Sequence, residues 1–560
     1  MSVNISSGNM CKTTNKIWLT TILCLFILSI IPGDAQSQYS SLFDKRSEYM
    51  GRLLQISGIA ETSSSYMIRP YGADKVLFNN EEDRTLWVSY LDGRYQESQP
   101  GFLPETATLF QSFNSTLPNG NNDGAIWQGK GFNVSLTSAW RYKKNIFEVS
   151  LNPIMAYSQN LPYDLGPLAR SGEMEFSYQY VLIDDVQRFG DSHTTWVNMG
   201  DSAVEIAVAG LRTGLSNKRM WVGPSVFNSL NFGYNAAGFL HYHISSDGPI
   251  STSIGDFEFN FLYGRLKKSP YFPVTDRRFT GLASITALYS PDFIPGLSVG
   301  AVRMFQSRWP ASLSDFTKDA RDLFQPFLKE NFVSEERPRG TDESNQLATI
   351  FLRWFFPDYG FEVYSEYGRN DHNFEANDLR TIPDHHRAYS IGFIKTFQRT
   401  PDLLASLNVE ITQFDPTRSV EILGGGRVAW QPHGLLLQGM TTNGQILGTS
   451  ASPGSNLQTV QLNEFSEKQS RGMFISRITH HNGGLIWRLN EIEALNDGST
   501  SFENYIRTEY QAGFSYTRQI WNRVEIASAL RMSYTFNQHH IYKNDVMNVQ
   551  LEIGLKKRFR

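Results

Sequence analysis

Hydrophobic and polar residues alternate along the last 14 residues of the chain. From Met547 to Phe559, one parity carries apolar side chains and the other carries polar, charged or glycine residues, with a single break at Lys557. A strand of about 9 to 11 residues with this period crosses a bilayer as part of a closed barrel. The pattern therefore predicts a transmembrane strand at the end of the chain; the alternative is an edge strand of a soluble sandwich.

The same period-two pattern recurs from residue 131 onward. Clear runs are Phe132 to Tyr142, Phe147 to Leu151, Phe257 to Tyr263, Ile506 to Tyr516 and Val524 to Phe536. About eighteen such runs are present when the weaker ones are included, a number typical of outer-membrane barrels. Sandwich strands average only about five or six residues, and charges on the polar parity of so many longer strands favour a water-accessible lumen. The predicted fold is all-β, a transmembrane antiparallel β-barrel of about 18 strands.

Two segments have helical spacing and predict small α-helical segments in the periplasm or the lumen. Phe43, Met50 and Leu53 lie one or two turns apart among charged residues, which predicts a short amphipathic helix on the periplasmic side. A second helix is predicted near 312–335, with a kink at Pro326. Because a helix cannot face lipid at membrane depth unless it packs on protein, we expect this insert in the lumen or at a barrel mouth.

The first 35 residues have the pattern of a signal peptide. An uncharged, mostly apolar stretch from Ile17 to Ile31 follows two lysines and is followed by small residues up to Ala35. About fifteen such residues are too few for a spanning helix but fit a cleaved export signal. The only cysteines, Cys11 and Cys24, lie in this segment, so the mature chain is expected to hold no disulfide and no thiolate metal site.

Export and the strand pattern together predict an outer-membrane location. The expected organisation is a signal peptide over 1–35, a periplasmic helical or irregular lead-in over 36–125, and the barrel over 126–560. An aromatic content of 13% and 44 glycines suit interfacial aromatic girdles and small residues at bends. Phe559, one residue from the end, is similar to the terminal aromatic that outer-membrane assembly machinery reads. No basic patch emerges, so no nucleic-acid partner is expected.

One stretch of the sequence resembles a known family. The stretch from Leu211 to Ile244 contains a tryptophan followed by Gly-Pro and, further on, Asn-x-x-Gly-Phe. Its sequence is LRTGLSNKRMWVGPSVFNSLNFGYNAAGFLHYHI. This order resembles the signature of the Wzi capsule-assembly family. Further similar segments are Arg52 to Ile59, Met67 to Tyr71, Ser290 to Phe305 and Phe361 to Asp371. The resemblance implies an outer-membrane barrel with periplasmic helices that acts as a lectin-like surface, holding capsular or exopolysaccharide at the cell surface.

The chemistry of the same stretch suits sugar binding. Carbohydrate sites need flat aromatic faces and planar polar groups that pair with vicinal hydroxyls. From this chemistry and the resemblance, we expect polysaccharide contacts at Trp221, Asn228, Asn235, His241 and His243. The alternative is that the aromatic residues belong to the interfacial girdle and the polar residues line the lumen. Tyr364 to His386 is a second candidate cluster.

Catalysis, metal binding and a cofactor are not expected. The string GLSVG at Gly296 to Gly300 matches Gly-x-Ser-x-Gly, but a nucleophile elbow needs a helix after it, and the sequence here continues as a strand. Adjacent histidines such as His385 and His386 point to opposite faces of a strand and seldom share an ion. The alternative function is a porin or a substrate-specific channel, since about eighteen strands can enclose an aqueous path.

Overall fold

In a computed structural model of the protein, the described residues run from Asp44 to Phe559 with internal gaps. The gaps are residues 63, 70–75, 92–100, 121, 167–175, 177–182, 276, 311, 313, 315–316, 318–343, 371–379, 381–385, 416–429, 452 and 482–501. The expected signal peptide and nearly all of the expected helix near 312–335 therefore lie outside the described residues.

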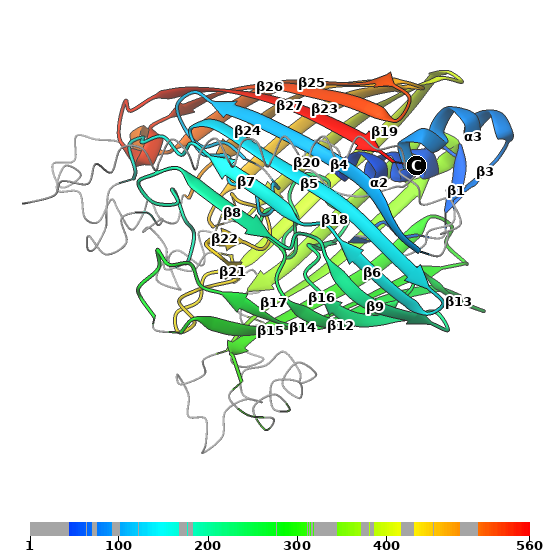
Figure 1. Cartoon of the computed structure of the whole chain (residues 1–560), viewed down its shortest axis with the longest axis horizontal. Coiled ribbons are helices and arrows are strands. Elements are labelled where there is room, and N and C mark those ends of the chain that lie inside the picture. Colours follow the sequence, from blue (N-terminus) through cyan, green and yellow to red (C-terminus); the bar gives the residue numbers. More distant parts are fainter. Residues whose placement is uncertain are drawn as a thin grey trace, which may run out of the picture.

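Eighteen antiparallel strands form a closed barrel (Figure 1), which confirms the predicted fold class. Three of the strands are interrupted and carry two labels each. In chain order the strands are β4 (Gly101–Asn114), β5 (Gly131–Lys144), β6 with β7 (Phe147–Leu151 and Ile154–Ser158), β8 with β9 (Thr194–Asn198 and Ala203–Val208), β10 (Leu211–Ser216), β12 with β13 (His241–Ser246 and Ile250–Thr252), β14 (Gly255–Lys267), β15 (Phe279–Pro291), β16 (Leu297–Arg308), β17 (Asn345–Phe356), β18 (Phe361–Asn370), β19 (Arg387–Thr400), β20 (Leu403–Gln413), β23 (Asn456–Ser466), β24 (Gln469–Thr479), β25 (Thr508–Trp521), β26 (Val524–Phe536) and β27 (Val546–Arg558).

Short elements complete the described structure. They are the helices α2 (Asp44–Ile56) and α3 (Glu81–Trp87), the paired strands β1 (Ala60–Thr62) with β3 (Val76–Phe78), β2 (Ile68–Arg69) with β11 (Trp221–Val222), and β21 (Thr441–Thr442) with β22 (Gln445–Ile446), and the 3-10 helices η1 (Val88–Leu91), η4 (Pro357–Tyr359), η6 (Phe502–Tyr505) and η7 (Gln538–His540). Among the described residues, no helix has both the length and the apolar content needed to cross a membrane.

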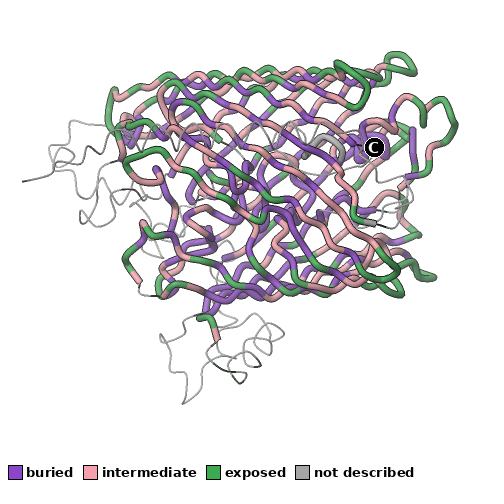
Figure 2. Tube along the Cα trace, viewed as in Figure 1, coloured by how far each residue is buried: buried purple, intermediate pink, exposed green. Residues whose placement is uncertain are grey.

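The barrel wall is apolar outside and polar inside. On β27, Leu551 is 49% exposed on the outer face, whereas its neighbour Gln550 is 1% exposed on the inner face. Buried and exposed residues alternate in the same way along the other strands (Figure 2). An exposed apolar parity around a closed barrel is a lipid-facing surface, and this architecture is that of an outer-membrane protein.

The two ends of the barrel differ in the length of their connections. At one end the turns are short, such as residues 145–146 between β5 and β6 and 522–523 between β25 and β26. At the other end they are long, such as residues 217–240 between β10 and β12 and 414–455 between β20 and β23. Short periplasmic turns and long extracellular loops are usual in this class. The end with short turns, where α2, α3 and the C-terminus lie (Figure 1), is therefore the periplasmic end.

The barrel begins earlier than residue 126, the boundary predicted from sequence. β4 pairs with β27 on one side and with β5 on the other, so the first barrel strand starts at Gly101, inside the predicted lead-in of 36–125. The alternation of β4 is weak, because Phe110 is buried on the inner face while Gln111 lies on the lipid face. A register shift between Pro104 and Thr106 interrupts it further, so the pattern alone does not identify this strand.

Candidate functional site

The long connection between β10 and β12 folds into the lumen. Two carboxylates on the inner wall accept hydrogen bonds from its backbone. Glu410 of β20 accepts from the N–H groups of Val226 at 2.7 Å and Asn228 at 2.9 Å, and Glu366 of β18 accepts from that of Ser225 at 2.9 Å. These bonds satisfy backbone donors that have no strand partner, and they fix the position of the segment.

A glycine permits the close approach of this segment to the wall. The backbone of Gly223 has φ +105°, a conformation that residues other than glycine rarely adopt. A Cβ atom there would lie 2.3 Å from Glu366 Oε1. Only glycine therefore fits between the segment and the β18 carboxylate without displacing it.

A second inward segment, residues 430–451, packs on the first. Trp430 Nε1 donates to the Leu230 carbonyl at 2.7 Å, and the Gly233 N–H donates to the Leu447 carbonyl at 2.7 Å. Apolar residues of both segments form one buried cluster with residues of the wall, such as Met304, from β14 to β17, β19 and β23. This half of the lumen is therefore filled by packed side chains.

Helix α2 lies inside the periplasmic end of the barrel (Figure 1). Its Arg52 donates from Nε to Glu362 Oε1 on β18 at 3.0 Å and from Nη1 to the Pro224 carbonyl at 2.7 Å. Tyr234 donates its hydroxyl to Glu48 at 3.1 Å, which joins α2 to the inward segment as well. The helix, the segment and the wall form one connected polar network in the lumen.

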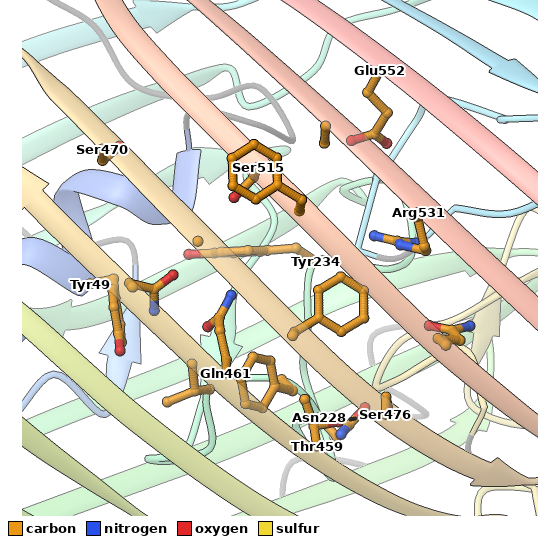
Figure 3. A pocket seen from close by; sticks show the side chains of 18 of the residues that line it. Tyr49, Asn228, Tyr234, Thr459, Gln461, Ser470, Ser476, Ser515, Arg531 and Glu552 are labelled. Atoms are coloured by element: carbon orange, nitrogen blue, oxygen red, sulfur yellow. Dashed lines mark hydrogen bonds between the residues drawn. The ribbon is translucent and has the colours of Figure 1, made fainter.

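The opposite half of the lumen, along β23 to β27, keeps open space. One cavity of about 330 Å³ is bordered by α2, the inward segment and this wall. A second cavity of about 230 Å³ lies nearer the extracellular loops, and both are bordered by Asn228, Gln511 and Arg531. Figure 3 shows Gln461, Ser515 and Arg531 on the strands around Tyr234. Apolar side chains such as Phe465 and Ile478 line this wall together with neutral hydroxyls and amides, which come from Thr459, Gln461, Asn463, Ser470, Ser476, Gln511, Ser515, Thr517 and Gln550.

Aromatic residues and charged residues of both signs line the same space. The Phe474 ring on β24 has the Arg531 guanidinium 5.6 Å from its centroid. Glu552 on the neighbouring strand β27 also lines the cavity and accepts from Gln128 Nε2 at 3.3 Å. The cavity thus offers hydroxyls, amides, aromatic faces and little net charge, which suits an uncharged, hydroxyl-rich ligand.

The structure brings three of the five residues predicted to bind sugar to these cavities. Trp221 and Asn228 border the larger one, and Asn228 and Asn235 border the smaller one. Trp221 is 1% exposed and lies between Arg69, whose Cζ is 4.8 Å from its ring, and Tyr234. These side chains have structural contacts as well as a place beside the open space.

His241 and His243 lie on β12 and border neither cavity. The Nδ1 atom of His241 is 2.8 Å from the Phe239 carbonyl, and His243 Nε2 is 3.1 Å from a Glu205 carboxylate oxygen on β9. Both histidines therefore support the wall next to the inward segment.

Residues of the second candidate cluster, Tyr364 to His386, also lie in different parts of the barrel. Tyr364 and Glu366 are buried wall residues that hold the lumenal segments, and Tyr364 donates to Glu410 at 3.0 Å. Tyr367 faces the lipid side, 38% exposed. Asp384 and His385 lie outside the described residues.

The sequence motifs weighed for catalysis lie in the barrel wall. Ser298 of the GLSVG string sits on β16, faces inward, and is bonded through its hydroxyl to Ser290 at 2.7 Å. The string continues as a strand, so it lacks the turn and helix of a nucleophile elbow. Within the described ranges no group of three or more His, Cys, Asp or Glu side chains is placed to hold a metal ion.

Sequence reasoning missed the polar wall from β23 to β27. Residues such as Gln461 and Gln511 were visible only as the polar parity of two strands. That parity is shared by every strand of the barrel, and the side on which the inward segments leave space is decided by long-range packing of residues 217–240 and 430–451.

Comparison with solved structures shows similarity at the level of the fold. Wzi of Escherichia coli, described as an outer membrane protein involved in group 1 capsule assembly and a carbohydrate-binding β-barrel, aligns with a TM-score of 0.58 and 12% identity over 93% of this chain and 99% of Wzi. OccAB2 of Acinetobacter baumannii aligns with a TM-score of 0.41 and 10% identity over 82% of this chain and 98% of that chain. A BenF-like porin of Pseudomonas fluorescens aligns with a TM-score of 0.39 and 8% identity over 82% of this chain and 98% of that chain. The sequence matches no family model and no curated protein. This chain thus shares the barrel fold of Wzi, which agrees with the family resemblance in its sequence.

Proposed function

We propose that this outer-membrane barrel binds capsular or exopolysaccharide and holds it at the cell surface as a lectin-like component of capsule assembly. The observation that carries the proposal is the lumenal cavity along β23 to β27, whose wall combines apolar side chains with neutral amides and hydroxyls. Such groups pair with sugar hydroxyls, and the rings of Phe474 and Tyr234 at the cavity offer apolar faces to sugar C–H groups.

Five residues are proposed to serve this site in two ways. Trp221, Asn228 and Asn235 border the cavities and are proposed as the contribution of the inward segment. His241 and His243 are proposed to act through β12, by keeping the start of the returning strand in place.

Retention of a long polymer does not require a tight single site. A hydrogen bond contributes only about 0.5 to 1.5 kcal/mol net, so one sugar unit binds weakly. A polymer of many repeat units that engages many barrels gains avidity from their linkage. The fold that this chain shares with Wzi, itself described as carbohydrate-binding, supports the proposal without deciding which polysaccharide is bound.

The test in cells is removal of the gene followed by measurement of surface-retained and released polysaccharide. We expect the total amount to be unchanged and the released fraction to rise, with rescue by the wild-type gene. An unchanged ratio of retained to released polymer would refute the proposal.

A transport channel is the second candidate function. The two cavities share the wall residues Gln511 and Arg531 and Asn228 of the inward segment, which would favour an aqueous path if α2 left the lumen. Planar-bilayer recordings separate the two functions, because a porin gives stable, large conductance steps, whereas a barrel with a packed lumen gives none.

A further inference from the structure

The outer surface of the barrel carries a cluster of cations at the extracellular ends of β14 and β15, which lie side by side in the wall (Figure 1). Leu262 and Leu266 of β14 point into the lumenal core, so Arg265 and Lys267 on the other parity point outward, and both are exposed. Arg278, the residue before β15, is exposed as well. Three cationic side chains therefore lie together on the outside of the wall.

One aromatic ring gathers these cations. The Phe279 ring centroid is 4.5 Å from Arg265 Cζ and 5.1 Å from Arg278 Cζ, and Lys267 is the cross-strand partner of Phe279. Among the described residues, none of these three cations has a carboxylate within 4.0 Å. Cations held this close repel one another, and an anion between them would relieve the repulsion.

The depth of the cluster in the membrane is marked by aromatic residues. Trp309 follows β16 and is 41% exposed, and its ring lies 6.0 Å from that of Tyr263, the outward residue that precedes Arg265 on its parity. Aromatic belts sit at the level of the lipid headgroups. Cations at this level destabilise a barrel much less than the same residues at the bilayer midplane.

We propose that Arg265, Lys267 and Arg278 form a binding site for the phosphate groups of the phosphorylated glycolipid that makes up the outer leaflet of the outer membrane. The guanidinium fork pairs with two phosphate oxygens, and the ammonium adds a point charge. The site is separate from the lumen, so it neither requires nor follows from polysaccharide binding.

The test uses the purified full-length barrel in detergent, titrated with bisphosphorylated lipid A and with the same lipid after enzymatic dephosphorylation. Bound lipid is counted by native mass spectrometry. The variant combines Arg265→Gln, Lys267→Gln and Arg278→Gln. We expect its dissociation constant for the phosphorylated lipid to rise at least about tenfold, since each cation near an anionic surface contributes roughly fivefold. Dephosphorylated lipid should bind wild type and variant alike.

A matched control removes three outward cations at the periplasmic end, by Arg471→Gln, Arg518→Gln and Lys557→Gln. The control should bind the phosphorylated lipid like the wild type, and both variants should keep the heat-modifiable band of a folded barrel. Unchanged affinity in the first variant, an equal loss in the control, or equal wild-type affinity for the two lipids would each overturn the proposal.

Discussion

Arg52 of α2 and Glu362 of β18 form an ion pair inside the barrel, with 3.0 Å between Arg52 Nε and Glu362 Oε1 and with both side chains buried. Glu362 also accepts from Arg353 Nε at 2.7 Å. One wall carboxylate thus holds both a neighbouring strand residue and the N-terminal helix. Helix α2 is thus fixed at this end of the lumen by a specific polar contact as well as by apolar packing.

Replacing Arg52 with methionine should release α2 from the wall. Loss of one partner from a buried pair costs on the order of 3 kcal/mol, and the Pro224 carbonyl also loses its donor. We expect measurable single-channel conductance and faster proteolysis of the N-terminal segment. The control is Arg84→Gln, which breaks an exposed pair with Glu81 and should change neither readout, because exposed pairs contribute about 0 to 1 kcal/mol. Equal behaviour of Arg52→Met and wild type would show that Arg52 does not hold α2 in the lumen.

Glu410→Ala should free the inward segment. The backbone N–H groups of Val226, Phe227 and Asn228 would lose their shared acceptor, and each buried unsatisfied donor costs about 1 to 3 kcal/mol. Hydrogen exchange should accelerate at these three amides by at least about tenfold. Glu464→Ala, which removes a carboxylate of β23 paired with exposed Arg471, serves as the control. Persistent protection of the three amides would show that apolar packing alone holds the segment.

The extracellular loops should loosen as the pH rises through about 6. Burial raises the pKa of Asp184 from 3.8 to about 6, and its carboxylate joins two loops by accepting from the Ser269 N–H at 2.6 Å. Between pH 3.8 and about 6, Asp184 therefore keeps its proton in the folded state and loses it in the unfolded state. The stability from this group is fully present below pH 3.8 and is lost as the pH rises through 6.

Proteolysis of the loops, measured between pH 5 and 8 with a correction for protease activity, checks this dependence. Asp184→Asn should remove the loosening near pH 6, because the amide cannot ionise. A pH profile in Asp184→Asn that matches the wild type would assign the effect to the neighbouring Asp185, whose pKa is raised to about 8 by burial.

Removal of residues 546–560 should abolish assembly. β27 pairs with β26 on one side and with β4 on the other, and without it the sheet has two open edges in lipid, where unpaired backbone groups cost several kcal/mol each. Removal of Arg560 alone is the control and should leave a heat-modifiable band. A folded, membrane-embedded protein without β27 would be incompatible with barrel closure through this strand.

The barrel could be predicted from sequence because its signal is local. The alternation from Met547 to Phe559 can be recognised from the two-residue period of a strand alone. The same period predicted the positions of β5, β14, β25 and β26 closely. β4 was not predicted, because apolar Phe110 faces the lumen and polar Gln111 faces the lipid, the reverse of the usual pattern. The amphipathic spacing from Phe43 to Ile56 predicted the helix observed as α2.

The site was less accessible to such reasoning. Trp221, Asn228 and Asn235 were grouped by chain position, but the placement of their segment depends on Glu366 and Glu410, which lie more than a hundred residues away. No local pattern contains that contact. The cavity wall from β23 to β27 depends on where two loops pack, and its residues share the polar parity of every other strand.

The most direct test of polysaccharide binding in the lumen is a titration of purified barrel with polysaccharide fragments from the native host. The variant Gln461→Leu with Gln511→Leu keeps the approximate volume of the wall and removes its amides; Gln111→Leu makes the same change on the lipid face of β4 as a control. We expect the double variant to bind about tenfold more weakly, because two hydrogen bonds are lost, and the control to bind like the wild type. Unchanged affinity in a correctly folded double variant would contradict polysaccharide binding in the lumen.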